Sequence, residues 1–206
     1  AVPADMNWTR AEKDRMVRQM SLLTLSEALE PSKEKPALVL WPEAPAPLYY
    51  YQDEDLRRTA TEIARLSEAP FLFAGVAYTP QHEPLNSAFV LDARGRLVGR
   101  YDKQFLVPFG EFIPSGFGWI SKISSEAGDY VAGTRSGVFQ TGDRTLGLFI
   151  CYESAFPHLV RETAKAGADV LINLTNDGYF GKSAAREQHL WLARMRAVEN
   201  RRWLLR

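Results

Sequence analysis

Two periodicities alternate along the 206-residue chain, one typical of amphipathic helices and one typical of buried strands. The first helical segment begins near Thr9 and Glu12, which have the spacing of a capping box. In that motif each side chain accepts a hydrogen bond from the other residue's backbone N–H. Met16, Met20 and Leu23 then fall on one helical face. The pattern therefore predicts an opening helix whose apolar face packs against the rest of the protein.

The apolar runs that follow are short and are separated by glycine, proline and polar turns. We expect Leu56, Ile63 and Leu66 to form the inner face of a second helix, and Gly95 to lie in the turn of a hairpin. The predicted elements are a strand at 37–41, a helix at 53–68, a strand at 71–78, a hairpin at 87–103, strands at 137–141 and 144–150, a helix near 156–166, a strand at 169–175, a helix at about 184–200 and the start of a strand in 202–206.

This mixture of hairpins and helix–strand alternation predicts one α/β domain, residues 1–206, with mixed sheets. Residues 110–137 are rich in glycine, proline and aromatic side chains, which favours a long functional loop. The first predicted helix follows no predicted strand, and the last predicted strand has no following partner. We therefore expect a fragment of a larger protein, with the fold truncated at both ends.

The composition excludes several classes of function. Twenty-five basic residues balance twenty-five acidic ones, so net charge attracts neither nucleic acid nor an anionic surface. A single cysteine excludes an intramolecular disulfide and a cysteine-rich zinc site, and the three histidines lack metal-ligand spacing. No apolar run approaches the roughly 18 to 20 residues that span a bilayer. We expect no metal, no cofactor and no nucleic-acid partner.

Three residues with reactive side chains each follow a predicted strand. Glu43 comes after "LVLWP", Lys103 ends the hairpin, and Cys151, the only cysteine, ends the run "TLGLFI". Strand ends are rigid, and the loops beyond them are where α/β proteins build their sites. These three side chains are therefore the candidates for chemistry.

Together the three side chains suffice for acyl transfer without a histidine. A thiol attacks a carbonyl only as thiolate, and its free pKa is near ~8.5, so it needs a neighbouring base or cation. A carboxylate with little water around it can accept the thiol proton and return it to a leaving group. A lysine ammonium can stabilise the oxyanion that forms on the attacked carbonyl.

Each candidate, taken alone, also fits a structural role. Free cysteine is often buried as packing, and a glutamate after a cysteine can cap a helix. The structural alternatives are a surface acid for Glu43, a solvated strand end for Lys103, a turn residue for Glu111, core packing for Cys151 and a helix cap for Glu153. Only the joint pattern of nucleophile, base and cation favours catalysis.

Four motifs carry a resemblance to a known family. They are "WPE", "YDKQFLVPFGEFIP", "ICYESAFP" and "NLTNDGYFG…QHLWLARMRAVENRR". Glutamate, lysine and cysteine in this order resemble the carbon–nitrogen hydrolase (nitrilase) superfamily. Within it, the amino-acid sequence of the motifs from about residue 37 onward closely resembles that of the catalytic domain of the bacterial apolipoprotein N-acyltransferases.

The resemblance implies a nitrilase-like four-layer α-β-β-α sandwich. It also implies a role for each residue that matches a motif. These roles are nucleophile for Cys151, general base for Glu43, oxyanion stabiliser for Lys103, support of the site for Glu111, and substrate binding beside the thiol for Tyr152 and Glu153.

The activity implied is transfer of a fatty acyl chain from a membrane phospholipid to the N-terminal amine of an apolipoprotein, through a cysteine thioester. The resemblance places the enzyme at the bacterial inner membrane, with this domain on the periplasmic face and membrane contact through segments that the family carries outside it.

Two alternatives remain open from the sequence: a soluble amidase of the same superfamily, and an inactive fragment. The discriminating feature is the loop 110–137, whose apolar side chains suit lipid contact but could also cover the core. These side chains are Phe112, Ile113, Phe117, Trp119 and Ile120.

Overall fold

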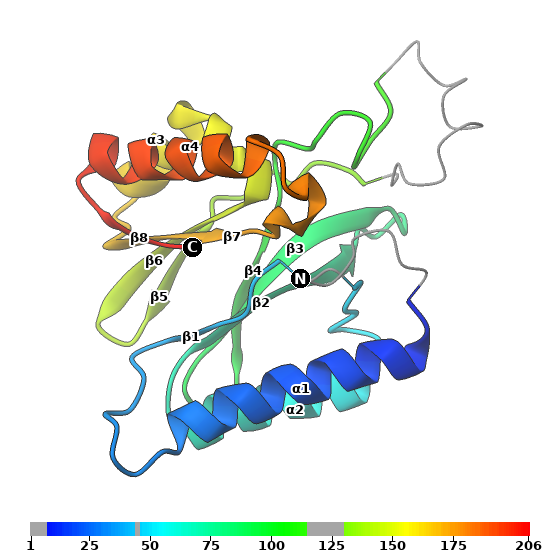
Figure 1. Ribbon diagram of the computed structural model, residues 1–206, viewed down its shortest axis with the longest axis vertical. Helices are drawn as coiled ribbons and strands as arrows, with labels where there is room; N and C mark the ends of the chain where they lie inside the picture. The colour runs from blue at the N-terminus through cyan, green and yellow to red at the C-terminus, as the bar shows by residue number, and fades with distance from the viewer. Residues whose placement is uncertain (1–7, 44–45, 115–129) are drawn as a thin grey trace.

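The computed structural model describes residues 8–43, 46–114 and 130–206. Within them the chain forms four layers: two helices, a sheet, a second sheet and two more helices (Figure 1). This arrangement confirms the α-β-β-α sandwich. The long functional loop predicted at 110–137 lies largely in residues 115–129, which are outside the described residues.

The first half of the chain forms one sheet and its two covering helices. Its elements are α1 (Arg10–Ala28), β1 (Val39–Leu40), α2 (Glu54–Ser67), β2 (Phe71–Tyr78), β3 (Pro84–Leu91) and β4 (Leu97–Asp102). The sheet order is β1-β2-β3-β4, with β1 parallel to β2 and the other neighbours antiparallel. Gly95 has φ of +76° in the turn between β3 and β4, which confirms the predicted hairpin.

The second half forms the other sheet and its helices. Its elements are β5 (Val138–Thr141), β6 (Arg144–Ile150), the 3-10 helix η2 (Cys151–Ala155), α3 (Pro157–Lys165), β7 (Val170–Leu174), the 3-10 helix η3 (Asp177–Phe180), α4 (Ala185–Asn200) and β8 (Trp203–Leu205). The order is β5-β6-β7-β8, antiparallel between β5 and β6 and parallel thereafter.

The core has three layers because each sheet is covered on both faces. Leu72 and Tyr101 of the first sheet meet Leu148 and Ile172 of the second between the sheets. Alternate side chains of the first sheet, such as Phe71, face α1 and α2 on the other side. Burial on both faces explains why the strands are nearly continuous apolar runs.

Several local predictions are confirmed and two are wrong. The capping box at Thr9 and Glu12 is formed, and Met16 is buried. Leu23 is 69% exposed and Leu66 is 50% exposed, so neither belongs to an inner face. The buried stripe of α2 includes Ile63, and at about 100° per residue Leu66 falls well to one side of it.

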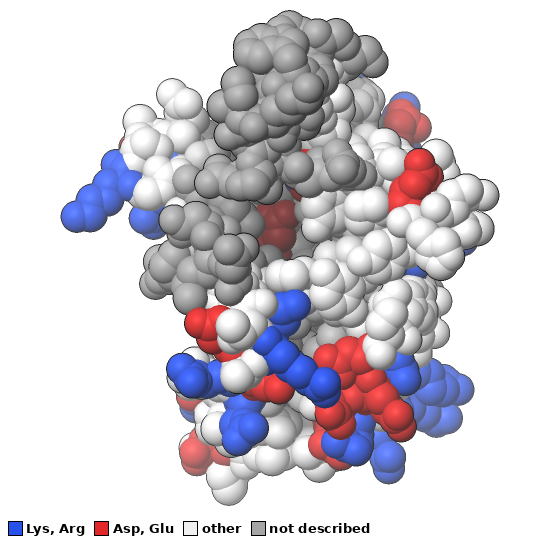
Figure 2. Space-filling view, turned by 90° about the vertical axis from the view of Figure 1, so that its right-hand side faces the viewer, with Lys and Arg blue, Asp and Glu red and all other residues white. Residues whose placement is uncertain are grey.

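The bounds of two strands differ from the predicted ones. The strand predicted at 37–41 pairs with β2 only at 39–40, and the first hairpin strand begins at Pro84 rather than Ser87. The short final strand is confirmed as β8, which pairs with β7. Basic and acidic side chains are intermixed on the face shown in Figure 2, as the balanced composition predicts.

Candidate active site

Cys151 lies where β6 ends and η2 begins. β6 is an interior strand between β5 and β7, and its last residue, Ile150, pairs with Leu174 of β7. The backbone of Cys151 has φ of +49°, in the left-handed region that residues with a Cβ rarely adopt. This turn brings the half-buried thiol into hydrogen-bonding contact with Glu43 and Thr175.

Lys103 follows β4 and is 1% exposed. Its backbone N–H donates to the Asn86 carbonyl at 2.8 Å, and the Gly133 N–H donates to the Lys103 carbonyl at 2.8 Å. A Cβ at Gly133 would lie 2.2 Å from the Asp102 carbonyl oxygen, so this close approach requires glycine. The Lys103 ammonium donates to both carboxylate oxygens of Glu111, at 2.9 and 2.8 Å.

Glu43 lies just beyond β1, at the edge of the first sheet. Its Oε1 accepts from the Asn86 side-chain amide at 3.1 Å, and its Oε2 accepts from the Asn176 backbone N–H at 3.2 Å. Asn86 belongs to β3 and Asn176 follows β7, so both sheets hold the carboxylate. The Asn86 amide also donates to Glu111 at 2.7 Å. One amide therefore fixes both glutamates around the lysine.

The electrostatics of the site follow from this burial. Burial and the Glu43 carboxylate raise the pKa of Cys151 to about 12, although the Lys103 ammonium opposes them. Burial alone lowers the pKa of Lys103, but Glu43 and Glu111 reverse that effect, and the pKa is raised. The resting site therefore holds a neutral thiol beside a permanent cation. Glu43 is the group placed to accept the thiol proton.

Glu153, two residues after Cys151, is fully buried. One oxygen accepts from the backbone N–H groups of Gln104 and Phe105, at 2.6 and 3.1 Å. The other accepts from the Ile150 N–H at 2.7 Å, and the Tyr101 hydroxyl donates to the carboxylate at 2.8 Å. Burial raises the pKa of Glu153, while these hydrogen bonds oppose the rise.

This enclosed carboxylate corrects the expectation that Glu153 binds substrate. Its oxygens are occupied by protein donors and have no exposed surface. The contact with Ile150 is instead the helix-capping role that the sequence left open. Because its partners lie at the ends of β4 and β6, Glu153 ties the strand before Lys103 to the strand before Cys151.

Tyr152 remains accessible, with 38% of its surface exposed. Its ring makes an edge contact with Phe156 at 5.3 Å, and Phe156 stacks on Phe105 at 4.1 Å. Phe105 follows β4, whereas Tyr152 and Phe156 follow β6, so aromatic rings from segments after both sheets meet close to Cys151. A contact between Tyr152 and substrate is compatible with this position.

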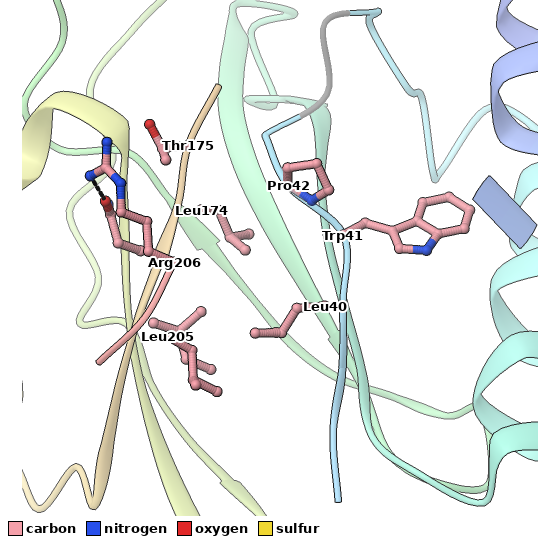
Figure 3. A pocket seen from close by; sticks show the side chains of 9 residues that line it. Leu40, Trp41, Pro42, Leu174, Thr175, Leu205 and Arg206 are labelled. Atoms are coloured by element: carbon pink, nitrogen blue, oxygen red, sulfur yellow. Dashed lines mark hydrogen bonds between the residues drawn. The ribbon is translucent and has the colours of Figure 1, made fainter. Parts of the chain in front are cut away.

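Two cavities of about 290 Å³ lie near the site. The first opens between the edge strands β1 and β8, where Leu40 and Leu205 extend into the space while Trp41 points towards the helices (Figure 3). The second adjoins Glu43 itself and is lined mainly by α1. Its lining residues are Met16, Gln19, Met20, Leu23, Pro42, Glu43 and Asn176.

No group of three or more His, Cys, Asp or Glu side chains in the described residues could hold a metal ion. Likewise, no helix in the part of the chain that the structure describes is long and apolar enough to cross a membrane.

Comparison with known proteins decides the family. The profile of the carbon-nitrogen hydrolase family matches residues 6–206. The chain belongs to this family. The two sheets and the turn at Cys151 described above therefore belong to a carbon–nitrogen hydrolase domain.

Curated relatives of this carbon–nitrogen hydrolase domain share a more specific name. An apolipoprotein N-acyltransferase of Geobacter metallireducens is 39% identical over 178 residues, which cover 82% of this chain and 33% of the relative. One from Brucella suis is 34% identical over 206 residues, covering 94% of this chain and 38% of the relative. The chain therefore spans between 33% and 38% of the length of these two relatives.

Solved structures confirm the nitrilase fold. A carbon–nitrogen hydrolase from Helicobacter pylori aligns with a TM-score of 0.69 at 22% identity, covering 93% of this chain and 66% of the other. A Saccharomyces cerevisiae member of branch 10 of the nitrilase superfamily aligns with a TM-score of 0.68 at 19% identity, covering 91% and 67%. At such identities the likeness establishes the architecture.

Sequence reasoning placed Glu43, Lys103 and Cys151 together with Glu111, and the structure brings all four side chains into one hydrogen-bonded site. It missed the polar residues that hold them: Asn86, Thr175, Asn176 and His189. Two of these, Thr175 and Asn176, lie in the motif "NLTND" directly after a buried strand, and that position was the available signal.

Proposed function

We propose that this carbon–nitrogen hydrolase domain is the catalytic part of an N-acyltransferase that works through a thioester on Cys151. The observation that carries the proposal is the hydrogen bond between the Cys151 thiol and the Glu43 carboxylate, beside the buried ammonium of Lys103. The name of the relatives points to an apolipoprotein amine as the acyl acceptor. A phospholipid as the acyl donor is what the resemblance of the sequence motifs implies.

In the first half-reaction, Glu43 takes the thiol proton as the sulfur attacks the ester carbonyl of the donor. The C–S bond forms and the carbonyl becomes a tetrahedral oxyanion, which the Lys103 ammonium stabilises. Collapse of this intermediate breaks the C–O bond. Glu43 returns its proton to the departing alcohol, which leaves as a lysophospholipid, and the acyl chain remains on Cys151 as a thioester.

In the second half-reaction, the acceptor's amine attacks the thioester carbonyl. Glu43 accepts a proton from the amine as the C–N bond forms, and Lys103 again faces the oxyanion. The C–S bond then breaks and the sulfur recovers a proton from Glu43. The products are an amide and the original thiol, so the domain returns to its resting state.

A lipid donor fits the apolar surroundings of the cleft. The cavity beside Glu43 is lined by Met16, Met20 and Leu23, and Leu23 is 69% exposed. Tyr152 adds an exposed ring next to the thiol. Exposed apolar surface next to a reactive centre is typical of contact with lipid or another protein. Phe117, Trp119 and Ile120, whose apolar side chains suit lipid contact or covering of the core, lie outside the described residues.

We further propose that the enzyme acts at the bacterial inner membrane, with this domain on the periplasmic face. The acyl chain of a phospholipid is held in the bilayer, so the cleft has to meet the membrane surface for the first half-reaction. The formation of the thioester and its attack by the amine require only the acyl donor and the amine acceptor.

The test is to incubate the protein with phospholipid in mixed micelles without an amine acceptor. The expected result is one added acyl chain in the intact mass, released by neutral hydroxylamine and located on Cys151. Hydrolysis of short amides without acylation by lipid would support the amidase alternative, and loss of both activities would support the inactive alternative. Equal acylation of Cys151→Ala would overturn the nucleophile assignment.

A further inference from the structure

His189 contacts the nucleophile residue through its backbone. It lies on α4, is 5% exposed, and its Nε2 is 2.9 Å from the carbonyl oxygen of Cys151. A carbonyl oxygen only accepts hydrogen bonds, so Nε2 carries the proton in this contact. With Nε2 bound to the carbonyl oxygen, this nitrogen does not act as the base for the thiol. That role stays with Glu43.

A second donor reaches the same oxygen from β7. The side-chain amide of Asn173 donates to the Cys151 carbonyl at 3.4 Å and to the Phe149 carbonyl at 3.3 Å. Asn173 is 1% exposed, and the oxygen of its side chain accepts from Arg206 at 2.7 Å. The carbonyl of the nucleophile is therefore held from α4 and from β7.

The other side of His189 completes the arrangement. Its Nδ1 lies 2.9 Å from an Asp177 carboxylate oxygen, and Arg206 donates to both oxygens of Asp177 at 2.8 Å. The polar contacts thus run in a closed ring: from the Cys151 carbonyl to His189, Asp177, Arg206 and Asn173, and back to the carbonyl. Arg206 also lies 3.0 Å from Nδ1, which accepts its hydrogen bond when the imidazole is neutral with the proton on Nε2.

The backbone of Cys151 explains why such a ring matters. Its φ of +49° is unfavourable for a residue with a Cβ, and such strain persists only where surrounding contacts fix it. The same turn directs the sulfur to Glu43 and Thr175. If the carbonyl rotated towards an ordinary conformation, the thiol would leave its base.

We propose that His189, with Asp177, Arg206 and Asn173, is a positioning residue that locks the left-handed turn of Cys151 and so aims the thiol at Glu43. The proposal rests on the proposed function for its effect on acyl transfer. The effect on the thiol itself does not depend on the substrate.

The lone cysteine allows a direct test. Because Cys151 is the only thiol in the chain, alkylation by iodoacetamide reports on its surroundings without any lipid. In His189→Ala, we expect the pH profile of alkylation to move from the perturbed wild-type profile towards that of free cysteine, near ~8.5. Acylation by phospholipid should fall about 10- to 100-fold in kcat with little change in KM, since a small misplacement of the nucleophile slows the chemical step.

His189→Gln is the conservative variant, because its side-chain amide can donate to the Cys151 carbonyl. It should recover much of the wild-type alkylation profile and rate. His82→Gln, in the exposed turn between β2 and β3, is the matched control and should behave as wild type. Thermal unfolding of each variant separates misfolding from misplacement; if His189→Ala is unfolded, the comparison of His189→Gln with Asp177→Asn takes its place.

Unchanged alkylation and acylation in a folded His189→Ala protein, or in Asp177→Asn where that comparison is used, would overturn the proposal. A shifted alkylation profile in a protein that never accepts an acyl chain from lipid would support the positioning role and count against the N-acyltransferase function. The two proposals can therefore fail separately.

Discussion

The thiol of Cys151 hydrogen-bonds to the carboxylate of Glu43, although the two residues follow strands of different sheets. This contact joins the two halves of the sandwich at the point where the chemistry is proposed. It also explains the raised pKa of the thiol, since burial and a neighbouring negative charge both disfavour a thiolate.

Replacing Glu43 should make the Cys151 thiol more acidic and at the same time abolish acyl transfer. In Glu43→Gln the negative charge is gone, so the pKa of Cys151 should fall from about 12, and alkylation at about pH 8 to 9 should become faster than in wild type. Acyl transfer should nevertheless be lost, because the amide cannot accept the thiol proton. Slower alkylation in the variant would show that Glu43 already deprotonates the thiol in the resting protein.

Cys151→Ser should form no detectable acyl adduct. An alcohol has a much higher pKa than a thiol, so the same carboxylate is a poor base for it. Intact mass measurement after incubation with phospholipid checks this result. An adduct of wild-type abundance in the Cys151→Ser protein, on the introduced hydroxyl or elsewhere in the chain, would contradict the assignment of the nucleophile.

Lys103→Ala should reduce the rate of acylation by about 10²- to 10³-fold, the usual effect of removing one donor to an oxyanion. Lys165→Ala on α3 is the control, since the Lys165 side chain is 64% exposed and pairs with nearby Glu162. Single-turnover kinetics with phospholipid measure both variants. Equal rates for the two would remove Lys103 from the mechanism.

Glu153→Gln should destabilise the domain by about 1 to 3 kcal/mol, because one buried backbone N–H group loses its acceptor. The glutamine side chain would keep one acceptor oxygen but present an NH₂ group to donors. Urea unfolding at neutral pH measures the difference. An unchanged free energy of unfolding would show that the carboxylate does not tie the two strands together.

The same residue gives a pH dependence of stability. Burial raises the folded-state pKa of Glu153 above its ordinary value of 4.5, so the folded protein binds this proton more tightly than the unfolded chain. The stabilisation is complete below pH 4.5 and is lost as pH rises through the folded-state pKa. The free energy of unfolding of the wild type should therefore fall across this pH window through Glu153, and this fall should be missing in Glu153→Gln. The difference between the two unfolding free energies at each pH measures the effect.

The sequence by itself determined the elements and the reactive residues. Periodicity predicted the helices, the hairpin and the buried strands. The strands were recognisable because a sheet covered on both faces requires continuous apolar runs. The capping box of Thr9 and Glu12 was also predictable from the sequence, because it depends on two residues three positions apart. Glu43, Lys103 and Cys151 stood out because each follows a strand.

Only the tertiary structure decided which polar residues hold those three in place. Asn86 on β3 and His189 on α4 are far from Cys151 in the sequence, and no local pattern distinguishes them from ordinary polar positions. It also assigned Glu153 to the interior rather than to the substrate. The physical reason is that hydrogen bonds between layers depend on how the two sheets pack and align, which the period of a single strand does not specify.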